Sequence, residues 1–267
     1  MKKLSKQEIG KLGLYEFQGY IGSMTSPTFG GWKGTDRLIE LLNIQEMEMP
    51  KILEVGCSTG YITRYIAQKF NCEIIGVDLS ILLLDIAEEE SRKLNLNNIS
   101  FKYANVENLP FSDNTFDIVY GEAITALVPD PIKVLKEYHR VLKPSGKIAT
   151  LDLFMKQSLS AEFTEEINEI MSQVIGAEVK IRSLREWKQI IKDSGFSSTK
   201  INDYYEDLFR REYSFGEKAK LTCKLLFHMI GNKEVRRKIV PPLKFARRFQ
   251  KALKGGNYGY LIFTGIK

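Results

Sequence analysis

The sequence predicts an α/β fold, in which a doubly wound, mainly parallel seven-stranded sheet is covered by helices. Three observations support this prediction. Short apolar runs alternate with stretches of helical periodicity, which is typical of parallel strands joined by crossover helices. The first apolar run ends in a glycine-bearing turn that leads directly into a helix. The chain of 267 residues is 43% hydrophobic and 27% charged, and it is long enough for one elaborated domain.

The strands and helices are expected in a regular order. The apolar run 51–55 is the first strand, and 61–68 is the helix after its turn. Later strands are expected at 73–77, 99–103, 117–120, 147–154, 196–204 and 258–266. Further helices are expected at 6–20, 37–42 (capped by Thr35 or Asp36), 81–94, 131–141, 158–176 and 184–194.

The alternation of strands and helices ends after residue 154, and this change predicts the domain organisation. Residues 1–154 should form N-terminal helices and a ligand-binding α/β core. The later segments are expected to be a cap insertion at 155–183, a core helix and strand at 184–206, a basic helical cap insertion at 207–256 and a final core strand at 257–267.

Positive charge is concentrated near the C-terminus. Residues 211–254 hold 13 Lys/Arg and 3 Asp/Glu, a net charge of +10, whereas the whole chain carries +6. Such a block suits nucleic acid, an anionic membrane surface or, as we favour, a solvated helical face. Apolar side chains recur within it at helical spacings and predict amphipathic helices: Phe227, Met229, Ile230, Phe245 and Phe249.

Composition also indicates where in the cell the protein is expected to lie. A run of about eighteen apolar residues is absent, so we expect no transmembrane segment, although peripheral contact with a membrane stays open. The N-terminus has charges but lacks the apolar core of a secretory signal. Cys57, Cys72 and Cys223 lie far apart without metal-ligand spacing. We therefore expect a cytoplasmic protein without a metal, and the sequence leaves its oligomeric state open.

Gly56 and Gly60 flank the turn after the first strand. Strand, glycine turn and helix bring a backbone close to a nucleotide-like ligand. Asp78 ends the second strand about twenty residues later, where its carboxylate would lie beside the turn and accept both hydroxyls of a ribose. The alternative is that Asp78 only caps the next helix together with Ser80. The turn lacks the third glycine of a dinucleotide site and the lysine of a P-loop, so a ligand with ribose and adenine but no phosphate fits better.

Four stretches carry a family resemblance. LEVGCSTGYIT, IIGVDLS, ANVENLPFSDNTFDIVYGEA and LKEYHRVLKPSGKIATLD resemble the successive motifs of class I S-adenosylmethionine-dependent methyltransferases, over about residues 30–153. The LPF-x-D-x-x-FD signature resembles the type 11-like branch that acts on small molecules. The resemblance implies a Rossmann-like methyltransferase fold with a helical cap, and S-adenosyl-L-methionine as the cofactor.

The resemblance also assigns residues to the methionine and ribose end of the cofactor. Glu54, Gly56, Ser58 and Gly60 would line this part, and Asp78 would hold the ribose hydroxyls. Ser58 replaces the usual middle glycine of the motif. Because a serine adds a Cβ where the backbone approaches the ligand, we expect its φ to be negative or slightly strained.

Other matching residues are assigned to the adenine and the reacting end. Leu79 and Leu83 would contact the adenine, and Val106 would offer its backbone N–H to the ring. Asn105, which replaces a commoner aspartate, would lie near the adenine amino group. Glu122 would lie near the methionine end of the cofactor or the acceptor.

Methyl transfer from a sulfonium needs few side chains, because positioning alone contributes on the order of 7–11 kcal/mol. A base is required only if the acceptor must lose a proton. The candidate catalytic residues are Glu122, His228 and Tyr20. For His228 and for His139, packing is the favoured interpretation.

The substrate should be enclosed by 1–35, about 155–183 and 207–256, which the sheet does not use. These segments are rich in side chains that either pack the cap's own core or line a lipophilic pocket: Phe154, Met155, Phe163, Met171, Tyr204, Tyr205, Phe209, Tyr213, Phe215, Phe227 and Met229. We therefore expect methyl transfer to a small, lipophilic acceptor. The alternatives are a nucleic-acid methyltransferase, which the absence of an N/D-P-P-Y/F motif disfavours, and a non-catalytic cofactor-binding protein.

Overall fold

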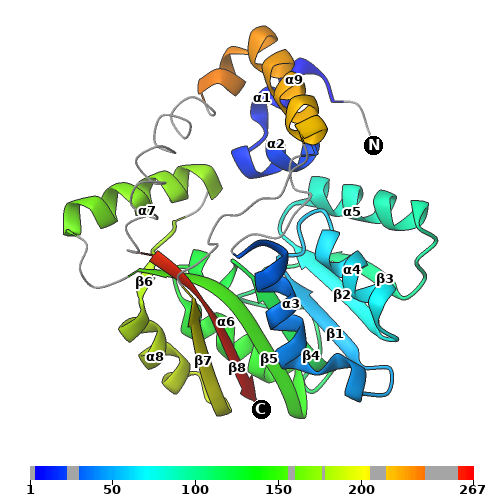
Figure 1. Ribbon diagram of the computed structural model, residues 1–267, viewed down its shortest axis with the longest axis vertical. Helices are drawn as coiled ribbons and strands as arrows, with labels where there is room; N and C mark the ends of the chain where they lie inside the picture. The colour runs from blue at the N-terminus through cyan, green and yellow to red at the C-terminus, as the bar shows by residue number, and fades with distance from the viewer. Residues whose placement is uncertain (1–3, 23–29, 156–159, 176–177, 205–214, 238–257) are drawn as a thin grey trace.

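The computed structural model describes residues 4–22, 30–155, 160–175, 178–204, 215–237 and 258–267 (Figure 1). Within these ranges the strands form one sheet in the order β3-β2-β1-β4-β5-β8-β7, and β6 pairs with β5. Strands β1 to β5 are parallel neighbours, whereas β8 runs antiparallel to β5 and β7. The predicted doubly wound, mainly parallel sheet is confirmed.

The strands follow the sequence-based expectation closely, except that β5 begins at Leu142 and β6 was not expected. Their bounds are β1 (Lys51–Val55), β2 (Glu73–Asp78), β3 (Ile99–Tyr103), β4 (Phe116–Glu122), β5 (Leu142–Met155), β6 (Arg182–Ser183), β7 (Ser197–Tyr204) and β8 (Tyr258–Ile266). The helices are α1 (Lys6–Lys11), α2 (Leu14–Tyr20), α3 (Gly31–Leu42), α4 (Tyr61–Lys69), α5 (Ile81–Lys93), α6 (Pro131–Val141), α7 (Ala161–Ile175), α8 (Leu184–Asp193) and α9 (Phe215–Gly231). Two 3₁₀ turns are η1 (Ile44–Glu46) and η2 (Thr125–Leu127).

Each face of the sheet has its own hydrophobic core, because successive side chains of a strand point to opposite faces. Ile52 of β1 packs with residues of α3 and α4, including Leu38, Leu42 and Ile66. Leu53, the next residue, packs on the other face with residues of α6 and α8, including Leu135, Tyr138 and Trp187. Burial on both faces explains why these strands read as continuous apolar runs.

Two N-terminal expectations were wrong in detail. The predicted helix 6–20 is divided into α1 and α2, because the chain leaves helical geometry at Leu12 and Gly13. The helix predicted at 37–42 begins at Gly31, after an N-cap at Gly30 with φ +74°. A Cβ at Gly30 would lie 2.7 Å from the Tyr260 ring, so glycine is required there. Thr35 is consequently buried inside α3 and does not cap it.

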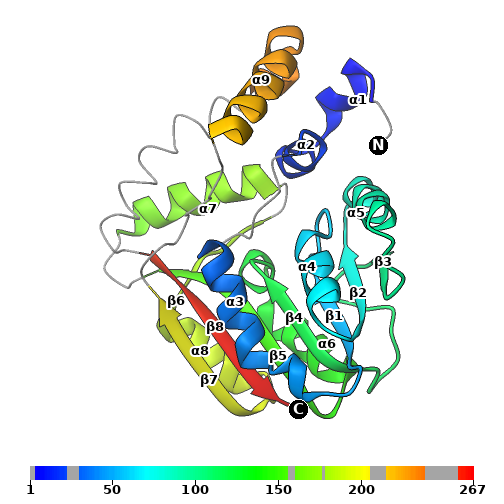
Figure 2. The same ribbon diagram turned by 45° about the vertical axis from the view of Figure 1, so that its right-hand side comes forward.

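A third, smaller core lies beyond the sheet, where α1, α2 and α9 come together (Figures 1 and 2). It contains Ile9, Leu14, Phe17, Tyr20, Ile21 and Val235, with Leu221, Leu225 and Met229 of α9 packed against them. We call this assembly the cap. Helix α7 lies nearer to the sheet than α9 does in both views, and its Phe163 and Met171 pack against the sheet's core. No helix among the described residues is long and apolar enough to cross a membrane.

Candidate active site

The turn between β1 and α4 has an unusual backbone. Gly56, Ser58 and Gly60 have φ values of +69°, +52° and +68°. A Cβ on Gly56 would lie 2.0 Å from Cδ1 of Ile124, and one on Gly60 would lie 2.7 Å from the Phe101 ring. These two positions therefore require glycine both for their conformation and for space.

Ser58 is held in the left-handed region, so of the two expectations for this serine the negative φ was wrong and the strained one holds. Its backbone N–H donates to Oδ2 of Asp78 at 2.9 Å. Its hydroxyl is hydrogen-bonded to the phenol of Tyr15. These contacts offset the cost of about 1–3 kcal/mol that a non-glycine residue incurs in this conformation.

Asp78 ends β2 beside the turn, where the sequence predicts its carboxylate. Oδ2 accepts from the Ser58 N–H, and Oδ1 accepts from the Ser80 N–H, each at 2.9 Å. Burial raises the pKa of the Asp78 carboxyl, while the backbone N–H groups of Ser80 and Ser58 oppose this shift. The carboxylate thus joins the glycine turn to the start of α5, where the Ser80 hydroxyl accepts from Leu83 N.

Glu54 of β1 is buried below the same turn. The Thr63 hydroxyl donates to its carboxylate, and the Tyr120 hydroxyl and the Arg64 charge lie close enough to stabilise its ionised form. Burial nevertheless raises the pKa of Glu54 to about 7. The desolvation of the carboxylate therefore outweighs these partners.

Glu122 is the last residue of β4 and is also buried. Its charge and that of Glu54 both act on Tyr120, whose pKa is raised well above its usual value, chiefly by burial. Glu54 in turn senses the charge of Asp78. The carboxylates of three strands, β1, β2 and β4, thus gather at the carboxyl edge of the sheet, where a cationic ligand would relieve their mutual repulsion.

The loop after β3 contains the residues assigned to the adenine. Val106 is buried, whereas Asn105 is exposed and its side-chain oxygen accepts from Glu107 N at 2.9 Å. On the facing loop, Leu79 is 57% exposed, which leaves its side chain available to a flat ring, whereas Leu83 is fully buried in α5.

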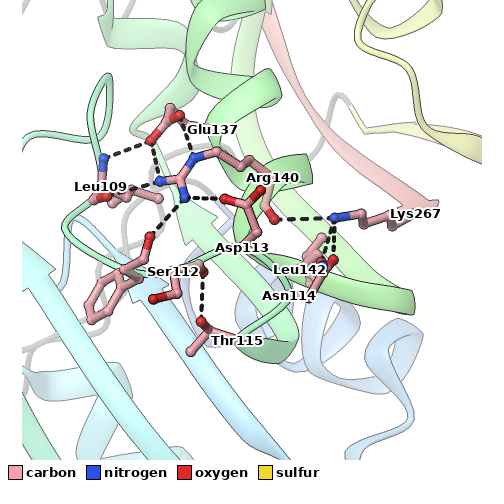
Figure 3. Close-up of polar contacts among 10 residues, drawn as sticks. Leu109, Ser112, Asp113, Asn114, Thr115, Glu137, Arg140, Leu142 and Lys267 are labelled. Carbon is pink, nitrogen blue, oxygen red and sulfur yellow. Dashed lines mark hydrogen bonds and ion pairs between the residues drawn. The ribbon is translucent and has the colours of Figure 1, made fainter.

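Two residues of α6 fix this loop (Figure 3). The Arg140 guanidinium donates to the backbone oxygens of Leu109 and Phe111 at 3.0 and 2.8 Å, and to the carboxylate of Asp113 at 2.8 Å. Glu137 accepts from the N–H of Leu109 at 2.8 Å and from the Arg140 guanidinium. Sequence reasoning missed both residues, although their spacing of three on a helix is a signal for such a pair.

Helix α2 covers the turn from the cap side. The Tyr15 phenol lies against Ser58 and Asp78, and burial together with the Asp78 charge raises the pKa of Tyr15 well above its usual value. The Ser80 hydroxyl donates to the carboxylate of Glu16 at 2.7 Å. Sequence reasoning assigned this region to substrate enclosure without identifying either residue, because nothing local distinguishes them.

Tyr20 and His228 lie together inside the cap. Their rings are 6.0 Å apart, and the ring of Phe17 is 5.7 Å from that of His228. The Tyr20 hydroxyl accepts from Leu4 N at 3.2 Å, and burial with the Lys224 charge lowers the pKa of His228. His139, which lies on α6, packs against the ring of Phe196. These contacts favour the packing interpretation for both histidines.

The loop after β4, which follows Glu122, is anchored by buried charges that sequence reasoning did not identify. Asp152 of β5 accepts from Ala126 N at 2.9 Å, and burial raises its pKa to about 6. The Arg182 guanidinium donates to the backbone oxygens of Val128 and Pro129 at 3.1 and 2.8 Å. Within the described part of the chain, no cluster of three or more His, Cys, Asp or Glu residues is arranged to hold a metal ion.

Known proteins are similar to this chain in sequence. A family model described as a methyltransferase domain matches residues 48–207. An uncharacterized protein of Haemophilus influenzae is 35% identical over 196 residues, which are 72% of this chain and 74% of that protein. Phosphoethanolamine N-methyltransferase 1 of Arabidopsis thaliana is 27% identical over 207 residues; the match covers 76% of this chain but only 39% of that protein.

A solved structure shows the same fold. The phosphoethanolamine N-methyltransferase 2 of Haemonchus contortus, in complex with S-adenosyl-L-methionine, aligns with a TM-score of 0.70 at 19% identity, over 99% of this chain and 60% of that one. Together with the sheet order and the family match, these findings confirm the resemblance seen in the sequence. The chain belongs to the methyltransferase domain family and has the fold of class I S-adenosylmethionine-dependent methyltransferases.

Proposed function

We propose that the chain transfers a methyl group from S-adenosyl-L-methionine to a small, lipophilic acceptor enclosed between the sheet edge and the cap. The observation that carries this proposal is the glycine turn at Gly56–Gly60 set among the carboxylates of Glu54, Asp78 and Glu122. The open backbone admits a ligand closely, and the carboxylates suit a ligand that carries positive charge.

The residues present fit this cofactor. Asp78 would accept the ribose hydroxyls, and Leu79 would contact the adenine above the loop that holds Asn105 and Val106. Glu54 and Glu122 would complement the positive charges of the methionine end. When bound, the cofactor supplies a methyl group that its positive sulfur already activates.

The chain's own contribution is positioning and the exclusion of water. Helix α2 would close over the turn through Tyr15 and Glu16, because both already contact the loops that would hold the cofactor. Glu122, at the end of β4, would orient the acceptor and take its proton if the reacting atom carries one. Tyr20 and His228 would act through the packing of the cap, which orders α2.

Apolar side chains between the sheet edge and α7 support a lipophilic acceptor. Met155 at the end of β5, Phe163 and Met171 on α7, and Tyr204 at the end of β7 pack against the core but remain partly exposed. Phe154, by contrast, is fully buried and belongs to the core alone. Tyr205, Phe209 and Tyr213 lie outside the described residues.

Transfer of labelled methyl groups tests this proposal. The protein is incubated with methyl-labelled cofactor and a cell extract, and the products are partitioned between an organic phase, an aqueous small-molecule fraction and macromolecules. We expect the label in the organic phase, and none with the Asp78→Asn variant, which should have lost cofactor binding in calorimetry. Label in the aqueous small-molecule fraction would contradict a lipophilic acceptor, and label in RNA would favour the nucleic-acid alternative suggested by the basic residues.

A further inference from the structure

Helix α9 is apolar on two opposite faces. Its inner face, with Leu221, Leu225 and Met229, packs against α1 and α2. On its outer face Leu226, Phe227 and Ile230 are 50%, 74% and 78% exposed. The amphipathic helix predicted for this segment has one buried apolar side only, so Phe227 and Ile230 depart from it.

The exposed apolar residues form one stripe. Ala219, Cys223, Leu226, Phe227 and Ile230 are all exposed, and their spacings of four, seven, eight and eleven from the first residue place them on one side of a helix. A helix that is hydrophobic all round is normally buried in a large core or a membrane. Here α9 lies at the end of the molecule farthest from the sheet, beside α1 (Figures 1 and 2).

Cations lie on α9 and on the segment that directly follows it. Residues 215–237 contain six Lys/Arg and two Asp/Glu, a net charge of 6 − 2 = +4. Lys220, Lys233 and Arg237 are exposed, and Arg237 pairs with Glu234 at 3.1 Å. Lys224 donates to the backbone oxygen of Ile21 at 3.0 Å, which ties the helix to α2. Apolar side chains beside lysine and arginine are the composition of helices that lie in the interface of an anionic bilayer.

We propose that the outer face of α9 docks the protein on the surface of an anionic lipid bilayer, with Phe227, Ile230 and Leu226 inserted between the headgroups. Nucleic acid would contact the cations. It would gain little from the stripe, which is mainly aliphatic and does not offer a row of aromatic rings for base stacking. A second copy of the chain would bring a second positive surface against the first. A bilayer with anionic headgroups satisfies both the apolar stripe and the charge.

Membrane docking does not require a particular methyl acceptor. It would nevertheless be linked to the active site, because α9 packs on α2, and α2 contacts the glycine turn through Tyr15. Docking would therefore bring the cap side of the active site to the membrane surface.

Sedimentation with lipid vesicles tests the proposal. The full chain is mixed with vesicles of phosphatidylcholine alone, or of phosphatidylcholine and phosphatidylglycerol in equal parts. We expect binding to the anionic vesicles that weakens as salt is added, and little binding to the neutral ones. A protein that stays in the supernatant with both, or that binds both equally, would overturn the proposal.

Paired variants separate the apolar and the charged contributions. Phe227→Gln with Ile230→Gln should lower the partition coefficient by about tenfold for each side chain. Leu41→Gln with Met49→Gln, two residues exposed elsewhere, should leave it unchanged. Lys220→Gln with Lys233→Gln should lower it by about fivefold for each cation on anionic vesicles only. Equal losses in the control pair, or no loss in the other two, would refute docking through α9.

Two further measurements address other occupants of this face. Suppose that the protein does not bind vesicles and that light scattering shows a dimer. If the dimer is lost in the Phe227→Gln and Ile230→Gln variant, the face belongs to a second copy of the chain. A gel shift with RNA that is insensitive to the same pair, again without vesicle binding, would assign the charge to nucleic acid. Either result overturns the proposal. Because the altered side chains are exposed, the variants should unfold at the wild-type temperature. If the Phe227→Gln and Ile230→Gln variant does not fold, the Lys220→Gln and Lys233→Gln variant tests the docking instead.

Discussion

The sheet and the cap differ in how completely their apolar surface is used. Both faces of the sheet are covered, and the residues that would hold the cofactor are fixed by strand ends, a glycine turn and buried hydrogen bonds. The cap has one small core and leaves an apolar stripe of α9 exposed. The proposed cofactor residues thus lie on the sheet, whereas the proposed acceptor would be enclosed by helices that retain surface for another contact.

The largest effect is expected at the turn itself. Gly56→Ala should lower the free energy of unfolding by about 2–4 kcal/mol, because the added Cβ would collide with Ile124 and the alanine would have to adopt a positive φ. Cofactor binding should weaken at least about a hundredfold in calorimetry. Gly195→Ala, with φ +88° and nothing within 4 Å of its Cβ, is the control for the backbone term alone. Equal destabilisation by both variants would show that the turn is not sterically constrained.

Buried carboxylates of the sheet should make stability fall as the pH rises, whereas the lowered pKa of His228 in the cap acts with the opposite sign. The pKa of Glu54 is raised by burial to about 7 in the folded protein, so between its ordinary value and that pH the native state holds the extra proton. Stability should therefore fall as the pH rises through this window, by at most about 3 kcal/mol from Glu54. Asp152, with a pKa raised to about 6, adds a change of the same sign.

Urea unfolding of the ligand-free protein at pH values from about 5 to 8 measures this slope. Glu54→Gln should flatten it and leave the part that belongs to Asp152 and Asp78, because burial raises the pKa of both carboxyls. Glu162→Gln, on the exposed surface of α7, should leave the slope unchanged. A free energy of unfolding that rises with pH, or a pH dependence that Glu54→Gln does not alter, would contradict the burial of a desolvated carboxyl.

Arg140→Gln tests whether α6 positions the loop after β3, which holds the residues proposed to contact the adenine. The variant loses the bonds to Leu109, Phe111 and Asp113, and because the guanidinium is partly exposed we expect a cost of about 1–2 kcal/mol. The KM for the cofactor should rise by about tenfold, more than kcat falls. Arg237→Gln removes an exposed ion pair and should change neither value. An equal loss of kcat with an unchanged KM would mean that the loop does not act through the cofactor.

The smallest effect is expected where the cap meets the sheet. Tyr15→Phe removes the hydrogen bond to the Ser58 hydroxyl but keeps the ring, so the Kd for the cofactor should rise by about fivefold. Tyr65→Phe, which removes the bond to Asp36 on the sheet's far side, should leave the Kd unchanged. If Tyr15→Phe leaves the Kd unchanged as well, the contact between α2 and the turn has no part in cofactor binding.

The sequence predicted the sheet well because its signals are local. Apolar runs define β1 to β5, and Ser80 and Asp130 cap α5 and α6 with their own side chains. The start of α3 was missed because the requirement for Gly30 comes from the ring of Tyr260, a residue distant in sequence.

The same reason explains what was missed in the site. Asp78 and the glycines form recognisable motifs, whereas Tyr15, Glu16 and Arg140 act only through contacts made after folding. Helical spacing predicted that Phe227 and Met229 lie on α9, but not that Met229 would face inward and Phe227 outward. Phe245 and Phe249 lie outside the described residues.

The position of β8 has a consequence for the order in which the fold can form. This strand comes last in the sequence but lies between β5 and β7 and pairs with both. During synthesis the elements around the glycine turn emerge first, yet β5 keeps an unpaired edge until β8 arrives. The nascent chain thus carries the residues proposed to hold the cofactor on an unfinished sheet, and its exposed edge is the part that would most need protection from aggregation before β8 is made.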